Sequence, residues 1–554
     1  MNTSGLFSKM RGMRIVVVFL ALLLAYGAVS YSPQASSTNV YSVDLGGVTG
    51  ATNNTILAFG RYVVIAPFWP SKGLAENGDL DVSQLDNHSL YVIDTKKPDA
   101  PPLSKKITSS RDSEPGAPNT VYFPTRVLFD PPSSTVYVRG TRFEEKDGEV
   151  TPIDVIAYVH FSLDEAGKPV LDSNVVTFDI PGVSTEHTSE APLDFALNGN
   201  GDTLVFTNGA SLFSYNLAQG YLYSVAIVQP DAYGPDDSIS FLNVDAATNV
   251  VSVCQNRRSV GEDTVTTVSS EISFYGLGVY GTFDPLKRTM PDQFPAGTAL
   301  ADGSNIAIVS HADSEFALFA TSDGSLCAVD LEGDDKIATV KRLYSFPELA
   351  HYSESDASPL LIQYDSSKRV VGIVKPGYTV QIRRPTNAKG PGIRRPTNLH
   401  ITSELAVLAM ARLGKKNKVT SANSFTEDFK DEGGLSNFVS GQNSEWLIAT
   451  YSGNLYSVGV AGDLQDSKPQ LVGPIGSRVD RLDYYADRTS IVAISSFTLD
   501  EAGIRMASPG SLVVGKMPDL QSQSGGAILQ ALLPIAAALS TPAPSIRRPS
   551  NVKR

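Results

Sequence analysis

The sequence predicts an all-β fold, and three observations support that prediction. Short runs rich in β-branched and aromatic residues recur from Asn54 to about Lys516, each bounded by Gly, Pro, Asn, Asp or Ser. Turns that contain Asp or Asn repeatedly precede these runs, as at Asn198–Asp202 and Ala301–Ser304. Helical periodicity is almost absent over the same stretch. With 554 residues, 42% of them hydrophobic, the chain can bury a large core.

One repeated heptapeptide indicates how the strands are arranged. Phe161–Gly167 reads FSLDEAG, and Phe497–Gly503 reads FTLDEAG 336 residues later. That offset divides into six or seven intervals of roughly 50 residues, close to the length of a four-stranded propeller unit. We therefore predict a β-propeller of roughly six to eight four-stranded blades over residues 51–517, with a short C-terminal helix. A strand–turn solution that arose twice would explain the heptapeptides equally well.

Strings such as Asn87–Asp94 (NHSLYVID) and Asn454–Val458 (NLYSV) give residues 50–517 a recognisable rhythm. In this rhythm the chain resembles the broad superfamily of irregular β-propellers with WD40- and YVTN-type repeats. Regular Gly-His and Trp-Asp pairs are absent, and Trp69 and Trp446 are the two tryptophans. The resemblance therefore implies an architecture and transfers no function.

The first thirty residues are typical of a secretory signal peptide. Lys9, Arg11 and Arg14 precede an apolar run that starts at Ile15, and Ala28-Val29-Ser30 supplies small residues for cleavage. The run to Val29 is shorter than the ~20 residues that span a bilayer, which favours cleavage over a signal anchor. We expect a secreted or cell-surface protein in which residues 1–30 are the signal peptide and residues 31–50 are a linker.

Export changes the interpretation of four further residues. In a eukaryotic host, Asn53 and Asn87 are N-glycosylation acceptors. Cys254 and Cys327, the two cysteines of the chain, lie in strand-like runs. They either form a single disulfide or are two buried thiols that pack as small apolar residues, and both alternatives stay open.

Two segments interrupt the strand pattern. Within residues 399–443, Ser403–Gly414 resembles a capped helix closed by glycine and lysines, with a buried strand as the alternative, and residues 415–443 resemble an exposed loop. The tail, residues 518–554, contains the apolar run Ala527–Leu539 and a basic end. We expect a short helix there, which either packs on the protein or makes peripheral membrane contact.

A triplicated hexapeptide, Ile-Arg-Arg-Pro-Thr/Ser-Asn, is the most distinctive local signal. It places paired arginines at three sites, namely Arg383 and Arg384, Arg394 and Arg395, and Arg547 and Arg548. Paired arginines in an exported chain are candidate dibasic processing sites, although the following proline opposes cleavage. Arg-Arg-Pro-Thr also resembles a basophilic kinase consensus. An exposed basic loop that docks on the acidic body or on an anionic partner is the simplest interpretation.

Motifs for catalysis and metal binding are mostly absent. The acidic run Asn77–Ser83 resembles a calcium loop but has Val82 where glycine is required. The six histidines form no His-Glu-x-x-His pair, and phosphate- and dinucleotide-binding glycine loops are missing. Glu186-His187 and His311-Ala312-Asp313 are the best loop candidates for a catalytic site in a central channel. We expect no metal and no cofactor.

The net charge argues against one class of partner, and three candidate functions remain. A formal net charge of −13 argues against nucleic acid, which requires a concentrated basic face. We expect a binding protein whose ligand is a protein or a glycan, held at a channel mouth lined by aromatics such as Tyr62 and Trp69. A propeller hydrolase that acts on a sugar or lactone is the first alternative. A processed precursor that releases peptides at the dibasic repeats is the second.

Overall fold

The computed structural model describes the chain between residues 40 and 516, with gaps. The described segments are 40–44, 56–59, 62–66, 89–94, 97, 100–107, 120–130, 133–147, 149–165, 168–172, 175–181, 195–208, 211–226, 238–244, 249–260, 265–294, 298–301, 304–311, 314–351, 359–383, 398–403, 405–440, 445–450, 452–474, 481–484, 490–500 and 503–516. The predicted signal peptide, the tail and both glycosylation acceptors lie outside them. Residues Asn39–Lys516 form one compact unit.

The described residues form seven four-stranded antiparallel sheets and one five-stranded sheet, which we number in chain order, and one two-stranded sheet. Sheet 1 comprises β2 (Ile56–Phe59), β3 (Tyr62–Ile65), β4 (Ser89–Asp94) and β5 (Leu103–Lys106). Sheet 2 comprises β6 (Tyr122–Asp130), β7 (Thr135–Lys146), β8 (Glu149–Leu163) and β10 (Val176–Asp179), and β9 (Pro169–Leu171) pairs with β8. Sheet 3 comprises β11 (Phe195–Leu197), β12 (Thr203–Thr207), β13 (Ser211–Asn216) and β14 (Leu222–Ala226). Sheet 4 comprises β15 (Ser238–Val244), β16 (Val250–Val260), β17 (Val265–Leu277) and β18 (Phe283–Arg288).

The second half of the chain repeats this organisation. Sheet 5 comprises β19 (Ala307–His311), β20 (Ser314–Ala320), β21 (Ser325–Asp330) and β22 (Val340–Ser345). Sheet 6 comprises β23 (Leu361–Asp365), β24 (Val370–Lys375), β27 (Val407–Leu413) and β28 (Val419–Phe425), with β25 (Tyr378–Arg383) and β26 (Asn398–Ser403) as an inserted hairpin. Sheet 7 comprises β29 (Leu435–Ser440), β30 (Glu445–Thr450), β31 (Asn454–Gly459) and β32 (Pro469–Pro474). Sheet 8 comprises β33 (Arg481–Tyr484), β34 (Ser490–Asp500), β35 (Gly503–Lys516) and β1 (Val40–Asp44).

Helices are almost absent from the described residues. Those present are three-residue 3₁₀ turns, η2 (Pro291–Gln293), η3 (Pro347–Leu349), η5 (Lys415–Asn417), η6 (Glu427–Phe429) and η7 (Leu464–Asp466). Within the described part of the chain, we find no helix with the length and apolarity to cross a membrane. The prediction of an all-β fold is therefore confirmed.

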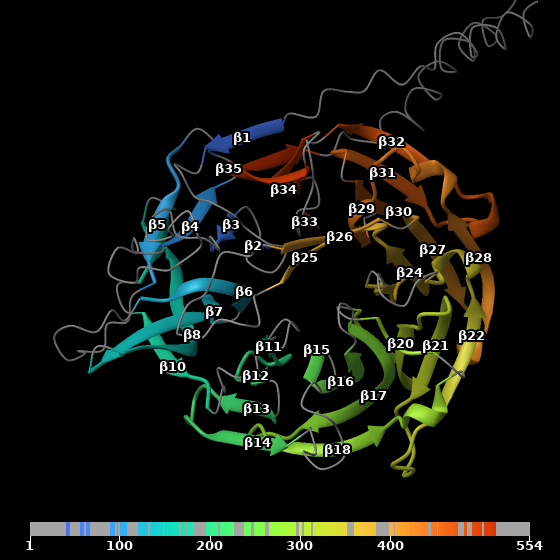
Figure 1. Ribbon diagram of the computed structural model, residues 1–554, viewed down its shortest axis with the longest axis horizontal. Coiled ribbons are helices and arrows are strands. Elements are labelled where there is room, and N and C mark those ends of the chain that lie inside the picture. The colour runs from blue at the N-terminus through green and yellow to red at the C-terminus, as the bar shows by residue number, and fades with distance from the viewer. Residues whose placement is uncertain are drawn as a thin grey trace, which may run out of the picture. The chain divides into compact units, whose positions relative to one another are not determined.

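Consecutive sheets contact one another mainly through their first strands, and the sheets can be followed in chain order in Figure 1. Strand β2 contacts β6, β6 contacts β11, β11 contacts β15, β19 contacts β23, β23 contacts β29 and β29 contacts β33. Sheets 4 and 5 share one hydrophobic cluster, which includes Ile272 and Phe319. Because β33 also contacts β2, the last sheet meets the first. This closed sequence of neighbours is consistent with a β-propeller.

The N-terminal strand completes the last sheet. Strand β1 pairs with β35 antiparallel, with Val40 opposite Gly515 and Asp44 opposite Ser511. The prediction that residues 31–50 are a linker is therefore wrong for residues 40–44. A five-residue strand with a single polar end is a weak sequence signal, because its stability comes from the partner strand supplied by the other end of the chain.

The predicted helix at Ser403–Gly414 is wrong, and the alternative buried strand is confirmed. Strand β27 lies inside sheet 6 and is buried almost throughout. Val407 and Ala409 pack in the cluster shared with sheet 5, whereas Leu408 and Met410 pack in the cluster shared with sheet 7. A strand buried on both faces has a continuous apolar run, so its sequence lacks the alternation that would distinguish it from a buried helix. The predicted loop 415–443 likewise contains β28 and β29.

The heptapeptide repeat does not mark equivalent positions in two blades. Its first copy covers the end of β8, the third strand of sheet 2, and its second covers the end of β34, the second strand of sheet 8. Both copies end strands that lead into antiparallel hairpins. The strand–turn explanation therefore holds. The first strands begin at unequal intervals, from 195 to 238 at the closest and from 361 to 435 at the widest.

Candidate functional site

A buried polar residue lies in or directly after the second strand of each of six consecutive sheets. It lies at the end of that strand, or directly after it, in sheets 3, 5, 6 and 7, and inside a longer strand, near the last pair with the first strand, in sheets 2 and 4. We call these residues the polar row: Arg139, Thr207, Asn256, Thr321, Lys375 and Thr450, in sheets 2 to 7. Each is at most 1% exposed. Burial of polar groups is costly unless each finds a hydrogen-bond partner, so the partners show what the row does.

Arg139 holds sheets 2 and 3 together. Its guanidinium donates to the carboxylate of Asp154 on β8, with Nη2 2.5 Å from Oδ2. The same Nη2 donates to the backbone carbonyl of Thr207, 2.8 Å away at the end of β12. A planar guanidinium suits this role because it forms several bonds in fixed directions.

Asn256 and Lys375 reach backbone carbonyls of the connections between sheets. Asn256 Nδ2 donates to the carbonyl of Leu300, 3.1 Å away between sheets 4 and 5. Lys375 Nζ donates to the carbonyl of Ala350, 2.9 Å away between sheets 5 and 6. Asn256 thus holds the connection between sheets 4 and 5, and Lys375 holds the connection between sheets 5 and 6.

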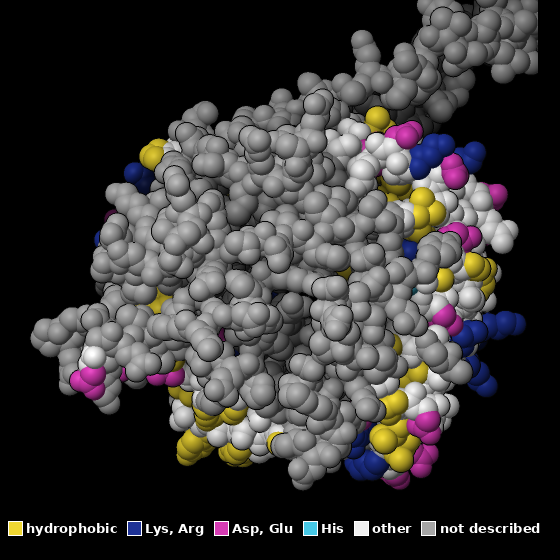
Figure 2. Space-filling view, in the orientation of Figure 1, with side chains coloured by type: hydrophobic (Ala, Val, Ile, Leu, Met, Phe, Trp, Pro, Cys, Tyr) yellow, Lys and Arg dark blue, Asp and Glu magenta, His cyan; other side chains and the backbone are white. Residues whose placement is uncertain are grey.

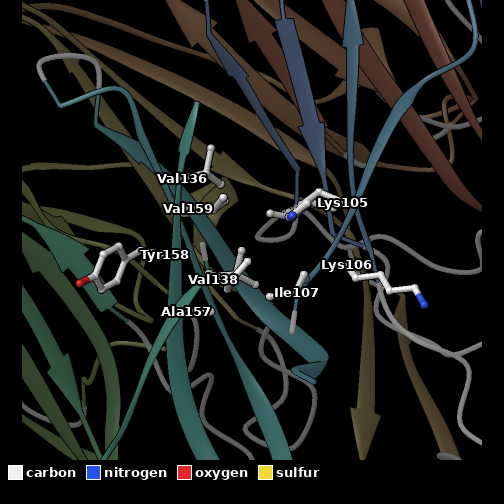
Figure 3. A pocket seen from close by; sticks show the side chains of 10 residues that line it. Lys105, Lys106, Ile107, Val136, Val138, Ala157, Tyr158 and Val159 are labelled. Atoms are coloured by element: carbon white, nitrogen blue, oxygen red, sulfur yellow. The ribbon is translucent and has the colours of Figure 1, made fainter. Parts of the chain in front are cut away.

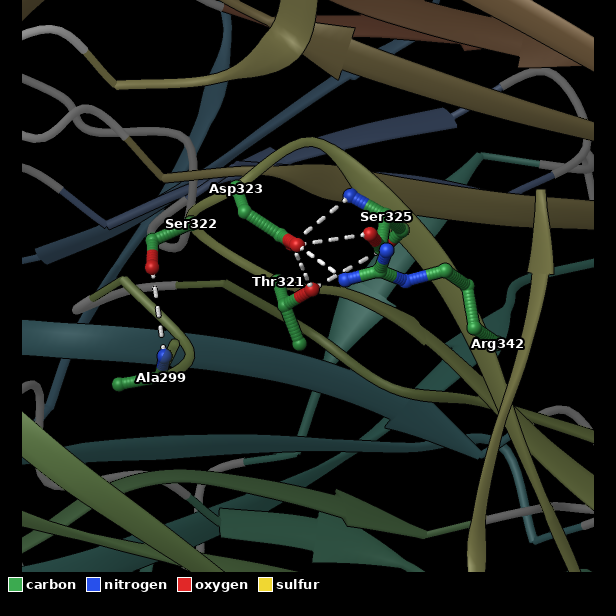
Figure 4. Close-up of polar contacts among 6 residues, drawn as sticks. All are labelled: Ala299, Thr321, Ser322, Asp323, Ser325 and Arg342. Carbon is green, nitrogen blue, oxygen red and sulfur yellow. Dashed lines mark hydrogen bonds and ion pairs between the residues drawn. The ribbon is translucent and has the colours of Figure 1, made fainter. Parts of the chain in front are cut away.

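Thr321 belongs to a tight turn that Asp323 organises (Figure 4). The Asp323 carboxylate accepts from Thr321 Oγ1 at 2.6 Å, from Ser325 N at 3.1 Å and from Ser325 Oγ at 2.9 Å. Arg342 Nη2, on the neighbouring strand β22, donates to Oδ2 at 2.6 Å. Gly324 has a φ of 78°, and a Cβ there would collide with the Phe346 carbonyl, so the turn requires glycine.

Thr450 belongs to a similar turn in sheet 7 that is closed by Glu432. The Glu432 carboxylate accepts from Thr450 Oγ1 at 2.9 Å, from Tyr456 Oη at 2.6 Å, from Asn454 Nδ2 at 3.0 Å and from the Ser452 hydroxyl. Burial raises the pKa of Glu432, but these four donors outweigh burial and lower its pKa overall. The carboxylate is therefore ionised at neutral pH and fully occupied by its own chain.

The residue type in the polar row correlates with the length of the connection between the second and third strands. Threonine precedes the short turns of sheets 3, 5 and 7, which end where β13, β21 and β31 begin. Arginine, asparagine and lysine precede long connections in sheets 2, 4 and 6. These long connections are two-stranded ribbons that extend past the outer strands of their sheets.

The ribbons are defined by their strand register. In sheet 2, residues 142–146 pair with 149–153, beyond the last pairs of β7 with β6 and of β8 with β10. In sheet 4, residues 257–260 pair with 265–269 in the same manner. In sheet 6 the ribbon is β25 with β26. Sheet 8 has a fourth, in which residues 497–500 pair with 503–506.

Hydrogen bonds place the second-strand ends of neighbouring sheets on one face. Ser322 N donates to the Ala299 carbonyl at 2.9 Å, next to Leu300, which Asn256 binds. His351 N donates to the Ser322 carbonyl at 2.9 Å, next to Ala350, which Lys375 binds. These bonds join sheets 4, 5 and 6 at the same end, and Arg139 joins sheets 2 and 3. We call the end with the second-to-third strand connections the ribbon face.

A small hollow lies between sheets 1 and 2 (Figure 3). Its apolar lining includes Leu90, Ile107, Val136 and Val159, with Lys105 and Lys106 beside it. It holds about 190 Å³, including space open to solvent. Ligand pockets usually hold ~300–1,000 Å³, so this crevice is a packing gap.

Of the site residues singled out in the sequence, the structure describes the two cysteines and one repeat arginine. Cys254 and Cys327 both remain thiols and lie in the hydrophobic cluster shared by sheets 4 and 5. Burial raises the pKa of Cys327 to about 12, so it is not a nucleophile. Of the six repeat arginines, Arg383 lies at the end of β25 and the other five are outside the described residues. Arg383, the second residue of the first hexapeptide repeat, pairs with Asn398, the last residue of the second repeat.

The predicted channel aromatics and catalytic loops gain no support. Tyr62 is 7% exposed and packs on Phe161, with ring centroids 5.1 Å apart, so it does not line an open channel. Trp69, Glu186-His187, Asp313 and the run Asn77–Ser83 lie outside the described residues, and His311 ends β19. Over the described segments, no group of three His, Cys, Asp or Glu residues is placed to hold a metal ion.

Comparisons with known proteins add three distant likenesses. No family model and no curated protein matches the chain. Saccharomyces cerevisiae Sqt1 is similar at 11% identity and a TM-score of 0.33, over 71% of this chain and 95% of that one. A functionally unknown protein from Desulfotomaculum acetoxidans DSM 771 is similar at 10% identity and a TM-score of 0.35, over 76% of this chain and 100% of that one. Kluyvelomyces marxianus Hsv2 is similar at 8% identity and a TM-score of 0.33, over 70% of this chain and 97% of that one. With TM-scores of 0.33 to 0.35, these likenesses assign neither a family nor a function to this chain.

Proposed function

We propose that this chain is an eight-bladed β-propeller, one blade for each sheet, that serves as a secreted or cell-surface binding protein. Its ligand is a protein or a glycan, and it binds at the ribbon face. The observation that carries this proposal is the set of two-stranded ribbons that extend from sheets 2, 4, 6 and 8.

The ribbons are not required to build the sheets. Sheets 3, 5 and 7 make the same connection with short turns, and their second strands are just as buried. The base of the ribbon in sheet 2 packs in the core through Phe143, which is 1% exposed, but beyond the outer strands the ribbon leaves its backbone edges unpaired within its own sheet. Such extensions on a rigid scaffold are typical of recognition elements, and their edges can accept a ligand strand.

The carboxylates behind the ribbon face favour binding over hydrolysis. A glycosidase needs two carboxyl groups that flank a substrate-sized space. Asp154 is occupied by Arg139, and Glu432 by four neutral donors. Neither carboxylate lines the crevice between sheets 1 and 2. These groups stabilise the scaffold and leave recognition to the ribbons.

A variant with a shortened ribbon tests the proposal. Residues 145–150 are replaced by Asn-Gly, which favours a tight hairpin turn between Glu144 and Thr151 and keeps the buried Phe143 and its neighbour Ile153. The full chain and this variant are secreted from eukaryotic cells and applied to arrays of glycans and of extracellular protein domains. The proposal predicts at least one saturable ligand whose affinity falls about tenfold or more in the variant. If no array member binds saturably, or if the variant binds equally well, the proposal fails.

The same preparation tests export and processing. Mass spectrometry of the secreted chain should find a mature N-terminus near Tyr31, which supports cleavage of residues 1–30. Termini next to Arg384, Arg395 or Arg548 would instead support a processed precursor. Retention of the intact chain in the cell would contradict export.

A further inference from the structure

The opposite end of the sheets presents exposed apolar side chains. Among the described residues, such side chains lie at the third-to-fourth strand connection of sheet 2, with Leu163 and Val170, and at those of the next three sheets. We call the five in these three sheets the apolar rim: Tyr221 and Leu222 in sheet 3, Val279 and Tyr280 in sheet 4, and Ile337 in sheet 5. Their exposed fractions run from 45% for Leu222 to 86% for Val279. Figure 2 shows hydrophobic side chains gathered at the lower left, over the sheet of β11–β14.

The three connections contact one another's sheets. Ser214 on β13 donates to the Gly281 carbonyl, so the turn that carries Val279 and Tyr280 lies against sheet 3. Tyr221 lies at the same edge, because its carbonyl accepts from Asn216 N at 2.9 Å. Outer strands β14 and β18 are also in contact. The rim is therefore continuous from sheet 3 to sheet 4.

The connection of sheet 5 lies along β18, with Ile337 at the far end of that strand from the Val279-Tyr280 turn. Ile337 bridges to Arg288, and Ala338 N donates to the Arg288 carbonyl at 2.9 Å. Lys336 Nζ donates to the carbonyl of Pro285, 2.9 Å away. Ile337 itself is 60% exposed, so this close fit of backbones leaves its side chain on the surface.

Equivalent connections in the next two sheets are charged. Sheet 6 places Lys415, Lys416 and Lys418 there, and sheet 7 places Asp463, Asp466 and Lys468. Solvent exposure at this end of a sheet therefore does not by itself select apolar residues. A local cluster of exposed aromatic and aliphatic side chains marks an interaction site.

Acidic side chains flank the rim and define its occupant. Asp284, Glu332, Asp334 and Asp335 are all exposed. Two lysines lie beside them, Lys336 bound to the Pro285 carbonyl and the 8% exposed Lys287 bound to the Glu332 carbonyl. Both lysines keep their charge, so the six residues together carry a net charge of −2. An acidic surround repels anionic lipid and a second acidic rim, and it attracts cationic groups.

We propose that the apolar rim docks a segment of a partner protein that carries apolar side chains next to lysines or arginines. This surface lies at the opposite end of the sheets from the ribbon face, so each of the two proposals can be tested independently of the other. The apolar side chains supply the affinity, and the acidic flank selects a basic partner.

The test uses two short synthetic amphipathic peptides with the same leucine positions, one with lysine and one with glutamate at the polar positions. Fluorescence anisotropy measures their affinity for the full chain. We expect the lysine peptide to bind about tenfold more tightly than the glutamate peptide. In V279S/Y280S its affinity should fall about tenfold. In D334N/D335N the affinity of the lysine peptide should fall about fivefold and should depend much less on the salt concentration.

A matched control separates the rim from general surface hydrophobicity. Leu471, 52% exposed on β32 of sheet 7, is changed to serine and should leave the affinity unchanged. Equal binding of the two peptides, or binding that V279S/Y280S leaves intact, would overturn the proposal. So would tighter binding to phosphatidylserine vesicles than to the lysine peptide, or a dimer of the full chain that V279S/Y280S dissociates.

Discussion

Sheets 2 and 5 solve the same structural problem in two ways. Each must connect its second strand to its third above a fully buried polar residue. Sheet 5 does so in a turn of a few residues, in which Thr321 binds Asp323 inside the turn itself. Sheet 2 continues both strands to Lys146 and Glu149, and Arg139 binds Asp154 across the base of that ribbon.

The difference shows what a longer connection requires. A tight turn satisfies its own polar groups, so a threonine suffices at its base. A ribbon takes its turn far from the core, so a longer side chain must secure its base to a neighbouring sheet, as Arg139 does at Thr207. The polar row therefore separates a rigid scaffold from the connections that vary above it.

The largest expected effect comes from breaking the base of the ribbon in sheet 2. Arg139→Met leaves the carboxylate of Asp154, 12% exposed, without its guanidinium. We expect a loss of about 3–5 kcal/mol in the free energy of unfolding, measured by urea denaturation. The double variant R139M/D154L should recover most of this loss, because apolar residues of similar volume replace both charges. A loss below about 1 kcal/mol in R139M would contradict the role assigned to Arg139.

A smaller effect is expected at the turn of sheet 7, where the partners of the carboxylate are neutral. Glu432→Ala leaves the hydroxyls of Thr450, Ser452 and Tyr456 without their acceptor. The cost should be about 2–3 kcal/mol, again by urea denaturation. Glu427→Ala is the matched control, since Glu427 is 83% exposed and pairs with a surface lysine, and it should leave the unfolding midpoint unchanged. Equal shifts for both variants would refute the comparison.

Acid should weaken a third carboxylate-held turn, in sheet 6. Burial raises the pKa of Asp365, but bonds from Ser367, Ser440 and Lys368 outweigh it and lower the pKa to about 2. The unfolded value is about 3.9, so this stabilisation is complete above about pH 4 and is lost as the pH falls towards 2. We expect it to amount to about 2 kcal/mol.

Urea denaturation of the wild type and of Asp365→Asn checks this pH dependence. The difference between their free energies of unfolding should be largest near about pH 5 and should shrink as the pH approaches about 2. A difference that grows on acidification has the wrong sign and would exclude Asp365 as the group responsible.

The smallest effect is expected at the edge of the turn in sheet 5. Arg342 is 48% exposed, although its Nη2 lies 2.6 Å from Asp323 Oδ2. Arg342→Ala should cost no more than about 1 kcal/mol, since solvent screens the pair and the local donors to Asp323 remain. Comparison of the melting temperatures of R342A and D323A measures this, and a larger loss in R342A would show that the ion pair, rather than the turn, holds sheet 5 together.

Much of the strand pattern was predictable from sequence, and the polar row was not. In runs such as Tyr62–Ile65 and Ser211–Asn216, apolar residues follow one another or alternate with polar ones, and this pattern is visible in the sequence of the single strand. Strand β27 was mistaken for a helix because burial on both faces removes alternation. Strand β1 was missed because its partner lies at the other end of the chain.

Arg139 and Lys375 follow apolar runs that resemble ordinary exposed strand ends. Their burial depends on carbonyl groups of residues distant in sequence, such as Ala350 for Lys375. The one sequence signal is that a charged or amide residue replaces threonine where the following connection is long. That signal becomes visible when the six second strands are aligned by structure. The apolar rim was missed because its residues lie in three separate turns.

The shortened ribbon of sheet 2 tests the separation of scaffold from recognition most directly. With residues 145–150 replaced by Asn-Gly, Phe143 stays in the core, Arg139 and Asp154 keep their bond and the sheet keeps all five strands. The measurement pairs the melting temperature of the variant with its affinity for the ligands that the full chain retains on the arrays. The account predicts a melting temperature within a few degrees of the wild type and a fall of about tenfold or more in affinity. A variant that unfolds, or one that binds as tightly as the full chain, would contradict it.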